Sequence, residues 1–339
     1  MPELVEARFY EKLPNRKIRC NLCPRQCLID DLERGYCGVR ENQGGTYHTL
    51  VYGNPCSVHI DPIEKKPLFH FLPGSAAFSI ATVGCNVLCK FCQNWEISQA
   101  RPEQVPSVDM PPKRVAETAA RNNCSCIAYT YTEPVVFYEY MYDTAREGRE
   151  RGVKSVMISN GYIRAEPMKD LCRVLDAVKV DLKAFNERFY RELVSGELRP
   201  VLDTLVLLRE QEMWTEIVYL VIPGQNDDPH ELEQMCQWIV AELGAETPLH
   251  FSRFHPQYRL TNLPSTPIET LRRARQIGID NGLRHVYTGN VPGDPGENTL
   301  CPQCHAVLIR RIGFSVVEMN LDKGACPHCG SVIAGVWHD

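Results

Sequence analysis

Three closely spaced cysteines are the residues with the clearest chemistry in this sequence. Cys85, Cys89 and Cys92 follow an apolar segment in the stretch SIATVGCNVLCKFCQNW, and no fourth cysteine or histidine follows nearby. A structural zinc site normally closes four protein ligands. Three thiolates on a tight loop instead suit a four-iron cluster that leaves one iron open for a substrate or cofactor. The spacing therefore predicts a [4Fe–4S] centre at these residues, with a partial zinc site or unconnected thiols as the alternative.

A second set of cysteines lies near the N-terminus. Its four thiols could together ligate one metal centre, and they are Cys20, Cys23, Cys27 and Cys37. Zinc is the favoured occupant, an auxiliary iron–sulfur cluster is the main alternative, and unpaired thiols are the third. Spacing alone does not decide between zinc and iron here.

A third set closes the chain with two Cys-Pro-x-Cys knuckles. Its members are Cys301, Cys304, Cys326 and Cys329. This spacing is close to that of a zinc ribbon, and four thiolates on one zinc would fold a small tail that has little core. Rubredoxin-like iron is the alternative. We expect the apolar segments 307–309 and 332–333 to form short hairpin strands across the knuckles, and the tail to be structural or to dock a partner.

Composition narrows the setting in which these cysteines work. The 339-residue chain has 16 cysteines and a formal net charge of −5. Its N-terminus has no apolar core of a secretory signal, so we expect a cytoplasmic protein whose cysteines are metal ligands or buried thiols rather than disulfides. No apolar run is long enough to span a membrane. The net negative charge argues against nucleic acid or membrane partners, and Arg310-Arg311 is a thin basic patch.

The elements that position these residues are read from hydrophobic patterning. Short apolar segments alternate with helical stretches, which predicts a parallel sheet with right-handed crossovers and chemistry at the C-terminal strand ends. The predicted strands are 78–83, 126–131, 153–159, 177–182, 215–222, 250–254 and 285–288. Three regions follow: a cysteine-rich region (1–75), an α/β core (76–290) and a zinc-ribbon-like tail (297–339), with the Gly/Pro-rich segment 289–298 as a linker.

The Cys-x3-Cys-x2-Cys loop after the first predicted strand resembles the hallmark of the radical S-adenosylmethionine (SAM) superfamily. The resemblance implies a partial (β/α)6 TIM-like barrel with small cysteine-rich appendages. It also implies that Cys85, Cys89 and Cys92 hold a catalytic cluster whose open iron is chelated by the amino and carboxylate groups of SAM. Reductive cleavage of SAM would then give a 5′-deoxyadenosyl radical. Phe91 matches the aromatic residue expected near the adenine.

Further matches follow the next two predicted strands. Tyr131-Thr132-Glu133-Pro134 resembles the family's Gly-Gly-Glu-Pro element, which implies that Glu133 receives the SAM ammonium. The alternative for Glu133 is a favourable charge at a helix N-terminus. Ser159-Asn160-Gly161 resembles the Thr-Asn-Gly turn of the pyruvate formate-lyase activating enzyme group, and Ile158 stands where that group has an aspartate.

Two more segments extend the match to that group. Asp181 and Lys183 resemble its Asp-x-Lys element, which implies that the lysine approaches the SAM carboxylate. Both side chains lie on one strand face because alternate residues point the same way, and an internal ion pair is the alternative. His255 matches a histidine expected near the ribose, although a lone histidine can equally be structural.

Nearly the whole chain resembles the radical SAM proteins of the AmmeMemoRadiSam system. The stretches that carry this resemblance are CNLCPRQC, GYCGVR, DPIEKKPLFHFLPG, CNVLCKFCQNW, VYTGNVPG, CPQCHAVLIRRIGF and CPHCGSVIAGVW. It implies Memo-like and AMMECR-one-like partners, together with an electron donor such as flavodoxin or ferredoxin.

These observations predict an enzyme that cleaves SAM and abstracts hydrogen from an unidentified substrate. An activase that installs a glycyl radical on a partner protein is the alternative fate for the radical. A non-enzymatic zinc-binding adaptor is the rival from another class. The adaptor would leave the three-cysteine loop, Glu133, Asp181 and Lys183 without a shared purpose.

Overall fold

The computed structural model describes residues 4–337, and its centre is an eight-stranded sheet in the order β14-β13-β12-β11-β10-β9-β8-β7. Strands β8 to β14 are parallel, whereas β7 pairs antiparallel with β8 at one edge. The strands are β7 (Ser57–Pro62), β8 (Ala76–Ala81), β9 (Cys126–Tyr129), β10 (Lys154–Ser159), β11 (Ala177–Asp181), β12 (Trp214–Val221), β13 (Leu249–Arg253) and β14 (Val286–Gly289).

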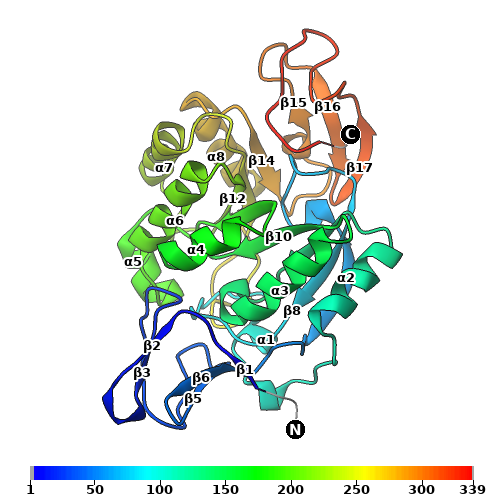
Figure 1. Cartoon of the computed structure of the whole chain (residues 1–339). Helices are drawn as coiled ribbons and strands as arrows, with labels where there is room; N and C mark the ends of the chain where they lie inside the picture. Colours follow the sequence, from blue (N-terminus) through cyan, green and yellow to red (C-terminus); the bar gives the residue numbers. More distant parts are fainter. Residues whose placement is uncertain (1–3, 338–339) are drawn as a thin grey trace.

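One long helix connects each parallel strand to the next, and these helices lie outside the sheet (Figure 1). They are α2 (Pro112–Arg121), α3 (Tyr138–Arg149), α4 (Ala165–Cys172), α6 (Leu198–Glu210), α7 (Pro229–Glu242) and α8 (Ile268–Asp280). The shorter helices α1 (Trp95–Ser98) and α5 (Glu187–Phe189) lie in the connections. Six strand–helix units followed by a seventh strand confirm the predicted partial barrel.

All seven predicted strands are present, and their ends differ from the predicted ones by at most two residues. Their side chains are buried along most of their length, because helices cover one face and the barrel interior the other. Strand β7 was not predicted. Its segment SVHIDP mixes polar and apolar side chains and ends on Pro62, a pattern that only an edge strand tolerates.

Two small antiparallel sheets make up most of the N-terminal region. One has the order β1-β6-β5 and the other β2-β3-β4. The strands are β1 (Val5–Glu6), β2 (Tyr10–Lys12), β3 (Ile18–Cys20), β4 (Leu28–Ile29), β5 (Arg40–Gln43) and β6 (Thr46–Thr49). They pack under the barrel at the end opposite the C-terminal tail (Figure 1).

The tail is a three-stranded antiparallel sheet of β15 (Thr299–Leu300), β16 (Val307–Ile312) and β17 (Ser315–Met319). The predicted strand at 307–309 is therefore present, but its hairpin partner is β17. The prediction of a hairpin strand at 332–333 was wrong: Val332 makes a single bridge to Ala325. The sequence Arg-Ile-Gly-Phe supplies a tight turn at Gly313, which closes the hairpin locally.

The tail also packs directly on the barrel. Arg311 is fully buried, donates to the Phe69 carbonyl over 2.8 Å and lies 3.7 Å from the carboxylate of Glu64. Farther along, Leu72 N–H donates to the Val336 carbonyl over 2.7 Å. The tail is therefore held by the connection between β7 and β8 as well as by the 289–298 segment.

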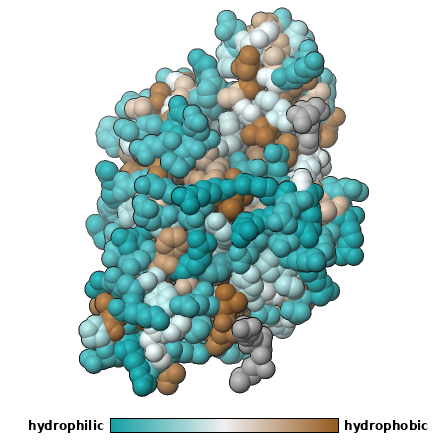
Figure 2. All heavy atoms as spheres, in the orientation of Figure 1, coloured by the Kyte–Doolittle hydropathy of each residue, from teal (hydrophilic) through white to brown (hydrophobic). Residues whose placement is uncertain are grey.

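Hydrophilic residues dominate the face of the molecule seen in Figure 2, with apolar patches scattered between them. Across the described part of the chain, no helix combines the length and the apolar character that crossing a membrane requires.

Candidate active site

A pocket opens at the C-terminal ends of the barrel strands. It is lined by all three cysteines of the predicted cluster loop, which follows β8. It is also lined by Glu133 after β9 and by Asp181 at the end of β11. In parallel sheets this end is where side chains from successive strands converge.

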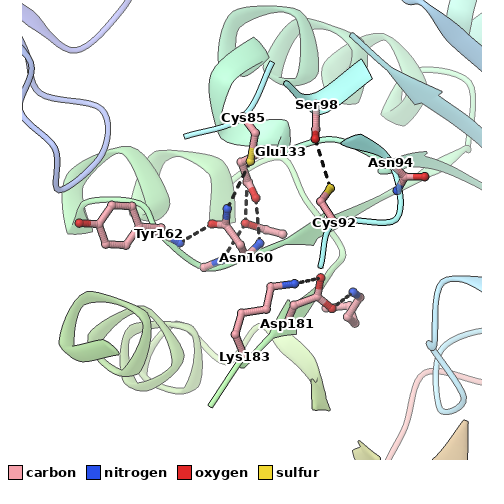
Figure 3. A network of polar contacts seen from close by, with 12 residues as sticks. Cys85, Cys92, Asn94, Ser98, Glu133, Asn160, Tyr162, Asp181 and Lys183 are labelled. Carbon is pink, nitrogen blue, oxygen red and sulfur yellow. Dashed lines mark hydrogen bonds and ion pairs between the residues drawn. The ribbon is translucent and has the colours of Figure 1, made fainter. Parts of the chain in front are cut away.

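The cluster loop is held closely against the rest of the protein. Cys92 Sγ lies 3.2 Å from Ser98 Oγ, and Asn160 Nδ2 lies 3.9 Å from Cys85 Sγ (Figure 3). Gly84 has a φ of +99°, and a Cβ there would lie 2.9 Å from the Cys37 carbonyl oxygen. Only glycine allows both this conformation and this close approach.

Glu133 is buried and surrounded by hydrogen-bond donors. Its Oε1 accepts from Ser159 Oγ over 2.7 Å, and its Oε2 accepts from the Asn160 N–H over 2.8 Å (Figure 3). Oε1 also accepts from Val135 N–H over 3.1 Å, so Glu133 does cap the short helix that begins at Pro134. Burial outweighs these bonds and raises the pKa of Glu133 to about 7.

Asp181 and Lys183 lie on the same pocket wall. Lys183 Nζ donates to Asp181 Oδ2 over 2.9 Å, and Lys179 makes an ion pair with the other carboxylate oxygen. Burial alone would raise the pKa of Asp181, but the two ammonium groups outweigh it and hold it at about 2. Sequence reasoning missed Lys179. The alternation of 179, 181 and 183 along one strand face could have identified it.

A second charged group was also missed. Asp61 on β7 accepts from Lys66 Nζ over 2.6 Å and from the hydroxyl of Tyr131. Lys66 and Tyr131 both line the pocket, and burial lowers the pKa of Lys66 to about 8. Tyr131 has a φ of +64°, the backbone region that favours glycine, at the first position of the element that resembles Gly-Gly-Glu-Pro. Asp61 and Lys66 belong to the stretch DPIEKKPLFHFLPG that carries the family resemblance, but the sequence did not place them at the site. The antiparallel β7 brings Asp61 within reach of Tyr131.

The other predicted residues fall into two groups. Phe91 is buried and lines the pocket, as does Asn160, while Ser159 reaches it only through its bond to Glu133. His255 is exposed, makes a 3.1 Å contact with Ser265 Oγ and is not among the pocket-lining residues. The structure therefore does not bring His255 to the site.

Comparison with known proteins decides the family. The profile of the radical SAM superfamily matches residues 79–239, which hold the cluster loop, Glu133 and the Asp181–Lys183 pair. An uncharacterized protein of Methanocaldococcus jannaschii is 50% identical over 330 residues, which cover 97% of this chain and 98% of that protein. The chain belongs to the radical SAM superfamily. It is thus related to enzymes, and the family implies a [4Fe–4S] cluster and SAM.

More distant radical SAM relatives agree. The pyruvate formate-lyase 1-activating enzyme of Escherichia coli K12 is 23% identical over 219 residues, or 60% of this chain and 89% of that enzyme. The crystal structure of a radical SAM methyltransferase from Sphaerobacter thermophilus superposes with a TM-score of 0.51. It has 18% identity over 67% of this chain and 71% of that chain, so this likeness concerns the fold.

The pocket suits a radical SAM cluster better than a single metal ion. Within residues 4–337, only the tail cysteines bring three or more ligand atoms within 4.8 Å of one another, so the three sulfurs of the cluster loop do not all lie within that distance. Burial raises the pKa of Cys89 to about 12. A buried thiol of this kind needs a strongly positive partner to ionise, and an iron cluster supplies it.

The tail cysteines do converge on one point. Cys301 and Cys329 have sulfurs 3.5 Å apart, and those of Cys304 and Cys326 are 3.6 Å apart. Sulfurs about 3.8 Å apart are expected when four thiolates surround one zinc at about 2.3 Å. The predicted four-cysteine group is confirmed as a candidate metal site.

Proposed function

We propose that this protein cleaves SAM reductively and uses the resulting radical to abstract hydrogen from a substrate. One observation carries the proposal: the three cysteines, Glu133 and the Asp181–Lys183 pair line a single pocket at the strand ends. In this proposal Cys85, Cys89 and Cys92 hold the [4Fe–4S] cluster. When reduced and bound to SAM, it supplies the one-electron cleavage of the sulfur–C5′ bond that gives the 5′-deoxyadenosyl radical.

Glu133 would orient the amino group of SAM. Its oxygens are fixed by Ser159 and by the backbone of Asn160. A pKa of about 7 means that its charge is only partly present in the free protein near neutral pH. The SAM ammonium would stabilise the ionised carboxylate, so Glu133 would lose its proton as SAM binds.

Lys183 would hold the carboxylate of SAM from the other wall. Its Nζ stays charged, because Asp181 outweighs the effect of burial and raises its pKa. Asp181 accepts from both Lys179 and Lys183 and so keeps both ammonium groups in place. It acts as a positioning residue in this proposal, since it reaches SAM through the lysine. Phe91 would pack near the adenine.

The substrate would enter where the pocket meets solvent. Phe314, at the tip of the tail hairpin, lines the pocket together with Leu220 and Ser252 from β12 and β13. The tail thus contributes a side chain to the space in which a substrate must lie. We propose that the tail holds zinc through its four cysteines and that it helps to recognise the substrate.

The 5′-deoxyadenosyl radical could act on either of two kinds of substrate. Modification of a small molecule, peptide or RNA is favoured, because the AmmeMemoRadiSam resemblance is not defined by a glycyl-radical partner. A glycyl-radical activase is the second candidate, favoured by the 23% identity to the pyruvate formate-lyase 1-activating enzyme. Memo-like and AMMECR-one-like proteins are the proposed partners, with flavodoxin or ferredoxin as the electron donor.

The test is SAM cleavage by the anaerobically reconstituted, reduced protein. We expect 5′-deoxyadenosine from the native chain and none from Cys85→Ala, Cys89→Ala or Cys92→Ala, since each removes a thiolate from a site with no spare. Cys172→Ala, on α4 and outside the pocket, is the matched control and should cleave SAM normally. Full cleavage by any cluster-loop variant would refute the assignment. With the native chain, deuterium transfer from labelled extract into 5′-deoxyadenosine would show that the extract contains a substrate.

A further inference from the structure

The four N-terminal cysteines gather around one pocket of the protein. Cys20 ends β3, Cys27 immediately precedes β4, and Cys23 and Cys37 lie in turns. All four line one small pocket, separate from the active-site pocket. Its remaining wall includes Tyr47, Val135 and Val136, so the pocket is largely apolar.

The spacing of these sulfurs differs from that in the tail. The tail sulfurs all lie within 4.8 Å of one another, and no three of the N-terminal sulfurs do so in the part of the chain that is described. Sulfurs about 3.8 Å apart are expected around a single zinc ion. The corners of a four-iron cluster hold their thiolates roughly 6 Å apart. The spacing of the N-terminal sulfurs therefore suits a cluster better than one ion.

Arg40 supplies an independent reason to place an acceptor in this pocket. Its side chain is 1% exposed and lines the pocket, and its Nε and Nη1 have no hydrogen-bond partner. The third nitrogen, Nη2, makes an ion pair with Glu139. Unsatisfied buried N–H groups are costly. The sulfides of an iron–sulfur cluster accept such hydrogen bonds and carry negative charge with their thiolates.

We propose that Cys20, Cys23, Cys27 and Cys37 hold a second [4Fe–4S] cluster. The site is closed by four protein thiolates, so this cluster has no open iron for SAM. It lies next to the active site: Asn86 lines the N-terminal pocket, and the preceding residue, Cys85, lines the active-site pocket.

The experiment counts metal in the full-length chain after anaerobic purification and reconstitution. The Cys85/Cys89/Cys92→Ala triple variant removes the cluster loop, so any iron left belongs to the N-terminal site. We expect about four iron atoms per chain in this variant and about eight in the native protein. The reduced triple variant should also give an electron paramagnetic resonance signal that SAM does not alter.

Two further variants keep the result interpretable. Cys20→Ala with Cys23→Ala should lower the native iron count by about half, and Cys172→Ala should not change it. If the triple variant does not fold, the iron content of the native protein tests the proposal instead. About four iron atoms per native chain would overturn it. Zinc in place of iron, about two irons, or no metal in a folded triple variant would equally overturn it. None of these readouts depends on SAM cleavage, so the proposed function can fail while this site stands.

Discussion

The backbone N–H of Asn160 donates to Oε2 of Glu133 over 2.8 Å. The side chain of the same asparagine lies 3.9 Å from Cys85 Sγ and donates to Asn86 Oδ1 over 2.9 Å. One residue after β10 therefore joins the proposed ammonium-binding carboxylate to the cluster loop after β8. Asn160 therefore sets the distance between Glu133 and the cluster loop, the two groups that SAM would contact at the same time.

Charge removal on either wall of the pocket should weaken SAM binding. Glu133→Gln and Lys183→Met each delete one charge-assisted contact, worth about 1.5–3 kcal/mol. We expect a loss of about ten- to a hundredfold in affinity, measured by equilibrium binding, with the absorbance of the cluster unchanged.

The matched controls are Glu166→Gln and Lys169→Met on α4. These two residues form an ion pair with side chains 78% and 45% exposed, and neither lines the pocket. Both controls should bind SAM like the native protein. Native affinity in the two pocket variants would remove Glu133 and Lys183 from the site.

SAM affinity should rise with pH up to about pH 7 and then level off. Below the Glu133 pKa of about 7, binding must release a proton from this carboxyl, which costs affinity up to about tenfold per pH unit. Glu133→Gln should flatten this dependence, and a slope that persists in that variant would assign the titration to another group.

The same carboxyl has an opposite effect on folding without SAM. Its pKa in the folded protein lies above the ordinary value of 4.5. Its contribution to stability is therefore full below about pH 4.5 and is lost as the pH rises through about 7. Denaturant unfolding of the native protein and of Glu133→Gln at both ends of this range measures the difference.

Gly84→Ala should destabilise the protein and hinder loading of the cluster loop. The new Cβ would lie 2.7 Å from Val39 Cγ1 and 2.9 Å from the Cys37 carbonyl, at a φ of +99°. Gly152→Ala is the control, because Gly152 also has a positive φ, +71°, but has nothing within 4 Å of the added Cβ. Backbone strain alone costs about 1–3 kcal/mol. We expect Gly84→Ala to lower the melting temperature and the iron content more than Gly152→Ala does. Equal losses in the two variants would contradict the close packing around Gly84.

Loss of the tail metal should leave iron in place. Cys304→Ala with Cys329→Ala removes two of the four converging sulfurs, and both residues are exposed. We expect the zinc content to fall by about one per chain while the iron content stays constant. Elemental analysis of native and variant protein measures both, and unchanged zinc would place that ion elsewhere.

Sequence reasoning recovered the barrel because its strands are buried on both faces and read as uninterrupted apolar segments. The resemblance to known motifs singled out Glu133 and Asp181, and both line the pocket. It missed Asp61, because an edge strand with mixed polarity carries no comparable signal, and it missed Lys66, which stands in the connection between β7 and β8. The second tail strand was misplaced because the apolar pair 332–333 lies beyond the turn at Gly313, which determines the actual hairpin.

Spacing in the sequence could not distinguish the two outer cysteine sets either. Both offer four thiols, and the number of intervening residues does not determine how far apart the sulfurs lie. The fold distinguishes the two sets. The four tail sulfurs lie close together, whereas the four N-terminal cysteines line a pocket together with Arg40.

Phe314 lies 46% exposed at the turn of the tail hairpin and reaches the pocket that the cluster loop also lines. It comes from a segment that supplies none of the proposed SAM contacts. The side chain at position 314 can therefore be changed without removing any of those contacts. Exchanging this turn between homologues would be a direct way to redirect one shared catalyst toward different molecules.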